Sequence, residues 1–60
     1  MSEEARQKVL EFLKTEPKGA ALLLVSKKVG LNPMETRKIL ETLVEEGVVE
    51  RKGRNYKLKS

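Results

Sequence analysis

The chain has 60 residues, a net charge of +4 and a pI of about 9.6, and it contains neither Cys nor His. A chain this short buries only about 60% of its unfolded surface, so nearly every large apolar side chain is needed for a core and little room is left for a substrate cavity. Cys is the residue that forms disulfides, and His is both the commonest metal ligand and the commonest general base. Because both are absent, we expect no enzyme activity, no cofactor and no metal.

A small basic chain is a candidate for binding nucleic acid or an anionic membrane surface. The longest apolar run, "AALLLV" over Ala20–Val25, is far shorter than the roughly 18 residues of a membrane span, so we expect no membrane partner. The charged start "MSEEARQK" has no apolar segment typical of a signal peptide. We therefore expect an intracellular protein with a single domain over residues 1–60.

A first helix is predicted over residues 2–15. Ser2 is suited to cap it, and the two acidic residues that follow favour a helix N-terminus. Apolar residues recur at helical spacing at Ala5, Val9, Phe12 and Leu13. Pro17 ends the helix, because the residue before a proline avoids the α region.

A second helix is predicted over residues 20–29, with Gly30 as its C-terminal stop. One face of this helix carries Leu22, Val25, Ser26 and Val29. Leu23 and Leu24 cannot both share that narrow face. We expect one of them to flank the core and the other to be exposed, and the alternative is that they form a small surface for a partner.

The segment "LNPMET" predicts the start of a third helix over residues 33–46. Asn32 is a strong N-cap, Pro33 suits the first helical position, and Glu35 stands where a capping box has its acidic member. The predicted buried face consists of Thr36, Ile39, Leu40, Leu43 and Val44. The opposite face carries Met34, Lys38, Glu41 and Glu45.

After Gly47 the period changes from helical to alternating, which predicts a β-hairpin over residues 48–59. "VVER" and "NYKLK" are the two strands, and Gly53 supports the tight turn between them. A two-stranded hairpin alone is barely stable in water, so its apolar side chains must pack against the helices. We accordingly expect Tyr56 in the core rather than stacked on a base.

The succession of three helices and a hairpin resembles the winged helix-turn-helix domains of bacterial and archaeal transcription regulators. The residues that carry the resemblance are "VGL" at 29–31, Leu43, and "EEGVVER", which leads from the third helix into the hairpin over residues 48–59, called the wing in that family. The resemblance extends from Val9 to Leu58. It implies a mostly α fold with a small β-hairpin, a three-helix winged helix-turn-helix. It also implies that the third helix enters the major groove of DNA while the wing follows the backbone or the minor groove.

The predicted partner is double-stranded DNA, read in a sequence-specific manner. Arg and Lys can donate to guanine, Glu can accept from cytosine, and Met can contact a thymine methyl group. The candidate base-reading residues are therefore Met34, Glu35, Arg37, Lys38 and Glu41. The candidate backbone-contacting residues are Lys18, Lys27, Lys28, Asn32, Thr42, Arg51, Lys52, Arg54, Asn55 and Lys57.

The charge is unevenly distributed along the chain. Residues 17–32 carry +3 and residues 48–60 carry +4, whereas residues 1–16 carry −1 and residues 33–47 carry −2. Positive charge thus lies on the parts expected to contact phosphates, on either side of a mixed third helix. This distribution suits sequence reading, since phosphate contacts supply affinity and base contacts supply specificity. We expect a monomer, because no obvious dimerisation helix is present. We also expect no small-molecule substrate.

Three alternatives remain. The acidic third helix with Leu23 and Leu24 could serve a protein-interaction winged helix. A reader of left-handed DNA would have Asn and Tyr on the third helix and a Trp in the wing; Arg37 and Glu41 stand at those helix positions and Trp is absent, so this reading is not favoured. The strong helix formers and clean caps are also typical of a designed or engineered protein.

Overall fold

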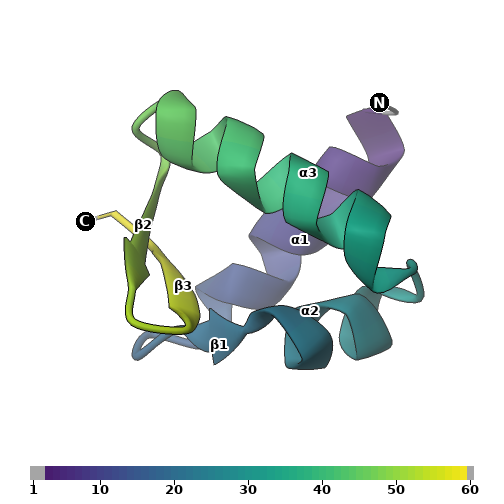
Figure 1. Ribbon diagram of the computed structural model, residues 1–60, viewed down its shortest axis with the longest axis horizontal. Coiled ribbons are helices and arrows are strands. Elements are labelled where there is room, and N and C mark those ends of the chain that lie inside the picture. Colours follow the sequence, from purple (N-terminus) through teal and green to yellow (C-terminus); the bar gives the residue numbers. More distant parts are fainter. Residues whose placement is uncertain (1–2, 60) are drawn as a thin grey trace.

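The computed structural model describes residues 3–59, which form three helices and a small antiparallel sheet (Figure 1). In chain order the elements are α1 (Glu3–Lys14), β1 (Ala20–Ala21), α2 (Leu22–Val29), α3 (Pro33–Glu45), β2 (Val49–Lys52) and β3 (Asn55–Leu58). The predicted winged helix-turn-helix fold is confirmed. The predicted cap at Ser2 lies outside the described residues.

The Asn32 cap and the Gly47 exit of α3 are confirmed, whereas no hydrogen bond from the Asn32 N–H to the Glu35 side chain, as in a capping box, is found among residues 3–59. The side chain of Asn32 accepts a 2.8 Å hydrogen bond from the backbone N–H of Glu35, and Pro33 occupies the first turn. At the other end Gly47 adopts a φ of +78°, and the N–H groups of Gly47 and Val48 donate to the carbonyls of Val44 and Leu43. These two bonds form a Schellman motif, which turns the chain sharply out of the helix and into the wing.

The prediction that the second helix begins at Ala20 is wrong. Ala20 and Ala21 form a short strand, β1, in which Ala20 pairs with Tyr56 and Ala21 with Asn55. Gly19 precedes this strand with a φ of +93°, and a Cβ at that position would lie 2.9 Å from the carbonyl oxygen of Tyr56. Two small alanines and a glycine thus let this segment approach β3 closely enough to complete a sheet.

The sheet has the order β1-β3-β2, so the last strand in the sequence is the central one. Strands β2 and β3 pair from Val49 opposite Leu58 to Lys52 opposite Asn55, which leaves a two-residue turn at Gly53 and Arg54. Gly53 has a φ of +60°, as the first central position of a type II′ turn requires. The predicted hairpin and its turn are therefore confirmed, with a third strand that the alternating pattern did not reveal.

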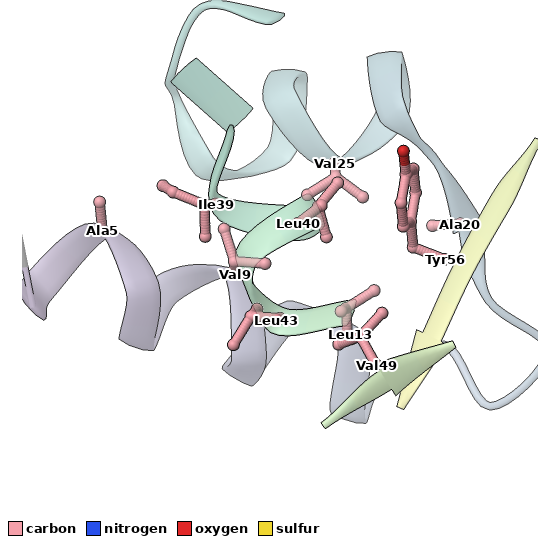
Figure 2. Packing of buried hydrophobic residues seen from close by; sticks show 10 residues of the cluster. All are labelled: Ala5, Val9, Leu13, Ala20, Val25, Ile39, Leu40, Leu43, Val49 and Tyr56. Atoms are coloured by element: carbon pink, nitrogen blue, oxygen red, sulfur yellow. The ribbon is translucent and has the colours of Figure 1, made fainter. Parts of the chain in front are cut away.

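The core lies where the three helices meet the inner face of the sheet (Figure 2). Its fully buried side chains come from α1, α2, α3 and β2, and the largest are Leu13, Ile39, Leu40, Leu43, Val9, Val25, Val49 and Thr36. Tyr56 is only 5% exposed, which confirms its expected place in the core. In α2, Leu22 packs against the core, whereas Leu23 and Leu24 are 67% and 40% exposed, so the expectation that one of them flanks the core is wrong.

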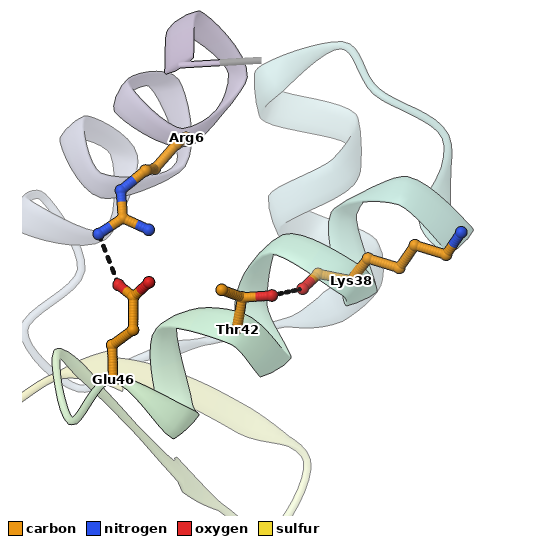
Figure 3. Close-up of polar contacts among 4 residues, drawn as sticks. All are labelled: Arg6, Lys38, Thr42 and Glu46. Carbon is orange, nitrogen blue, oxygen red and sulfur yellow. Dashed lines mark hydrogen bonds and ion pairs between the residues drawn. The ribbon is translucent and has the colours of Figure 1, made fainter. Parts of the chain in front are cut away.

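One ion pair joins the beginning of the chain to the end of α3. The guanidinium of Arg6 in α1 lies 2.6 Å from the carboxylate of Glu46, directly after α3 (Figure 3). Within residues 3–59, no buried side-chain nitrogen or oxygen lacks a hydrogen-bond partner. The ion pair therefore links α1 to the C-terminal end of α3.

Candidate nucleic-acid interface

The outer face of α3 carries several exposed side chains. Met34 is 73% exposed, and Arg37 and Lys38 are exposed as well. Neither cation has an ion-pair partner among residues 3–59, and Figure 3 shows the Lys38 side chain extended, with its ammonium group apart from the other side chains drawn. Because none of these side chains is needed for the core, each is available to a ligand.

An open groove of about 690 Å³ runs along this face of α3. It is lined by Asn32, Met34, Glu35, Lys38, Ile39, Glu41, Thr42 and Glu45. Four of the five candidate base-reading residues therefore line one surface, and Arg37 lies outside it. The groove lining is mixed in charge, with three carboxylates around one ammonium group, so it favours selective polar contacts over general attraction of an anion.

The two polar neutral candidates on this surface already have intramolecular partners. Thr42 donates a 2.8 Å hydrogen bond to the backbone carbonyl of Lys38, one turn earlier (Figure 3). Asn32 uses its amide oxygen to cap α3, while its amide nitrogen has no partner among residues 3–59. The Asn32 amide can therefore still donate to a phosphate, and the Thr42 hydroxyl oxygen can still accept.

Glu41 is the point at which α3 meets the wing. Its Oε2 accepts a 2.7 Å hydrogen bond from the hydroxyl of Tyr56 in β3, and the same oxygen lies 3.3 Å from a guanidinium nitrogen of Arg51 in β2. Burial of the phenol raises the pKa of Tyr56, and the neighbouring Glu41 carboxylate raises it further. Tyr56 is therefore a neutral hydrogen-bond donor to Glu41 at physiological pH.

The remaining wing candidates lie around the hairpin turn. Lys52, Arg54 and Asn55 are exposed, and Lys57 is half-buried opposite Glu50 in the β-ladder. Lys52 is 3.9 Å from Glu50, whereas Arg54 has no ion-pair partner within the described part of the chain. The tip of the wing thus presents two exposed cations, Lys52 and Arg54, at the end of the hairpin.

The cations of the α2 region are more dispersed. Lys27 and Lys28 are exposed in the last turn of α2, and Lys18 is exposed in the connector before β1. Lys28 lines a second open groove together with α1 residues that include Glu4 and Lys8, and this groove shares no residue with the one along α3. The structure therefore places Lys28 on the α1 side of α2 and does not bring it to the α3 groove.

Sequence reasoning assigned Glu41, Arg51 and Tyr56 to three different roles and did not predict their contact. The signal that could have found it is the length of the turn, because a two-residue loop at Gly53 and Arg54 puts Arg51 opposite Tyr56 on one face of the hairpin. That face points to α3. Only the packing angle between α3 and the sheet decides that Glu41 meets both.

Comparisons with known proteins agree with this architecture. None of the curated proteins matches the sequence. A solved structure described as "The binding mode of Cyprinid Herpesvirus3 ORF112-Zalpha to Z-DNA" superposes with a TM-score of 0.86, covers 98% of each chain and is 26% identical in sequence. The family model of the IclR helix-turn-helix domain matches residues 8–53, from α1 to the turn of the wing. The chain therefore belongs to the IclR helix-turn-helix domain family.

Proposed function

We propose that this domain binds double-stranded DNA, with α3 in the major groove and the wing on the sugar-phosphate backbone. The observation that carries the proposal is the exposed outer face of α3 with its polar groove, which the winged helix-turn-helix fold combines with exposed cations at the tip of the wing. An α-helix fits the major groove, where each base pair presents a distinct pattern of donors and acceptors.

The side chains divide into two groups by their position. Arg37 and Lys38, which have no ion-pair partner among residues 3–59, are donors suited to guanine, and Met34 offers an apolar contact for a thymine methyl group. Lys52 and Arg54 at the wing, with the Asn32 amide at the start of α3, are suited to phosphate oxygens. This arrangement supports sequence-selective binding, and we propose that the domain acts as a monomer in transcription regulation.

Fluorescence anisotropy with a pool of random duplexes tests the proposal. Binding should weaken steeply with salt, because each neutralised phosphate contributes about 0.9 to the slope of log K against log salt concentration. Selection of bound duplexes from the same pool then reports any base preference. Absence of salt-sensitive binding at micromolar protein would refute the function.

The similar solved structure, described as a Z-DNA complex, supports a second candidate, binding of a left-handed duplex. Arg37 and Glu41 on α3, where such a protein would have Asn and Tyr, and the absence of Trp make this candidate the weaker one. Circular dichroism of an alternating CG duplex distinguishes the two. A Z-DNA binder inverts the spectrum as protein is added, whereas a B-DNA binder leaves it right-handed.

A further inference from the structure

The carboxylate of Glu41 joins the recognition surface of α3 to both long strands of the wing. One oxygen, Oε2, accepts from the Tyr56 hydroxyl at 2.7 Å and from Arg51 at 3.3 Å. Glu41 is thereby bound within the protein, on a helix face whose other charged members, Lys38 and Glu45, have no ion-pair partner among residues 3–59.

The strand register explains why Arg51 differs from its neighbours in the wing. Side chains alternate along β2, so Val49 and Arg51 share the face that packs on the helices, while Glu50 and Lys52 lie on the other. Arg51 stands opposite Tyr56, and both side chains reach towards α3. The hairpin therefore directs Arg51 to Glu41, whereas Lys52 and Arg54 remain at the tip.

Electrostatics favours keeping this arrangement when an anion approaches. If Glu41 moved away, the part-buried Tyr56 hydroxyl would lose its acceptor within the protein, which costs free energy because the hydroxyl is partly shielded from water. If Arg51 left Glu41 for a phosphate, a bare carboxylate would face a polyanion. Together the two residues add no net charge to the interface, so the pair supplies no attraction for DNA.

We propose that Glu41 is a positioning residue of the DNA interface: it holds the wing against α3 through Tyr56, keeps Arg51 as its own counter-ion, and leaves Arg54, which has no ion-pair partner within residues 3–59, as the main wing cation that neutralises phosphates. This inference rests on the proposed function. It assigns Glu41 a role in fixing the angle between helix and wing, distinct from reading a base edge.

Two matched double variants test the inference. Glu41→Gln/Arg51→Gln and Glu45→Gln/Arg54→Gln each remove one carboxylate from α3 and one guanidinium from the wing, so both keep the net charge of +4. Neither Glu45 nor Arg54 has an ion-pair partner within residues 3–59. The measurement is the slope of log K against log salt concentration for one duplex, with thermal melting to confirm that each variant is folded.

The first double variant should keep the wild-type slope and lose about two- to threefold in affinity, because the exposed ion pair that orients the wing contributes only a small free energy. The second should lower the slope by about 0.9, because one phosphate contact is gone. A slope that falls equally in both variants would overturn the inference while the proposed function stands. Wild-type protein without salt-dependent binding would instead refute the proposed function, and the phosphate assignment with it.

A titration without DNA tests the contact itself. The chain has one Tyr and no Trp, so the rise in phenolate absorbance reports Tyr56 alone. Glu41→Gln should lower the pKa of Tyr56 and Arg51→Gln should raise it, because the carboxylate stabilises the protonated phenol and the guanidinium opposes this. Unchanged values in both variants would overturn the role of Glu41, whatever the DNA measurements show.

Discussion

The hydroxyl of Tyr56 donates a 2.7 Å hydrogen bond to Glu41, fifteen residues earlier in the chain. This contact crosses from the central strand of the sheet to the exposed face of α3. It lets one side chain contribute to the core through its ring and to the candidate interface through its hydroxyl. The contact also makes the stability of the fold depend on pH at its alkaline end.

Burial and the Glu41 carboxylate raise the pKa of Tyr56 above its ordinary value of 10.0. The folded state therefore holds the phenol proton more tightly than the unfolded state does. This stabilisation is fully present below about pH 10 and is lost as the pH rises through the folded pKa. Between neutral and alkaline pH, urea denaturation should show a larger loss of unfolding free energy for wild type than for Tyr56→Phe, which lacks the phenol but keeps the other titrating groups. Equal losses of unfolding free energy in the two proteins would contradict the raised pKa of Tyr56.

Gly19 and Gly53 both have positive φ, but their surroundings differ. Gly53→Ala should cost about 1–2 kcal/mol for the left-handed backbone, since its added Cβ meets open space. Gly19→Ala should cost more, because its Cβ would also lie 2.9 Å from the carbonyl oxygen of Tyr56 and push β1 away from β3. Denaturant unfolding shows which of the two variants is less stable. An equal loss of unfolding free energy in both would show that β1 can shift freely.

The cap of α3 is a local feature with a measurable value. Asn32→Ala removes the acceptor of the 2.8 Å bond from Glu35 and should reduce the free energy of unfolding by about 1 kcal/mol. Asn32→Ser should retain most of that stability, because serine is a comparable N-cap. Chemical denaturation compares the three proteins. A serine variant as unstable as the alanine variant would mean that Asn32 contributes through another contact.

Packing around α3 should be sensitive to the loss of a single methyl group. Ile39 is fully buried, so Ile39→Val should cost about 0.5–1.5 kcal/mol. Leu23→Ala removes a larger group but from a side chain that is 67% exposed, and its effect should stay within about 0.5 kcal/mol. The midpoints of urea unfolding provide the comparison. A reversed order would place Leu23 in a contact that the monomer does not explain.

Base reading and backbone contact predict different effects on DNA binding. Arg37→Ala or Lys38→Ala should relax the preference at one base pair, at a cost of about 1–3 kcal/mol for the preferred site. Arg54→Ala should weaken binding to every sequence alike and reduce the salt slope by about 0.9. Selection from random duplexes followed by anisotropy separates these outcomes. A uniform loss in the Arg37 and Lys38 variants would assign both residues to the backbone.

Much of the fold was predictable because its signals are local. The Asn32–Pro33 start of α3, the Gly47 exit and the Gly53 turn each depend on the conformational preferences of one or two residues. Helical spacing also identified the buried face that holds Ile39 and Leu43. The candidate residues on the opposite face followed from the same periodicity, since a side chain excluded from the core must face solvent or a partner.

Local residue patterns were sufficient to predict three helices, a hairpin, their buried faces and the separation of charge between the wing and α3. The strand at Ala20 and Ala21 could not be predicted in this way, because two apolar residues before a helix carry no period and depend on β3 for their hydrogen bonds. Only the tertiary structure brought Arg51 and Tyr56 to Glu41. That meeting depends on the angle at which α3 packs on the sheet, and this angle is set by the whole core rather than by any local run of residues.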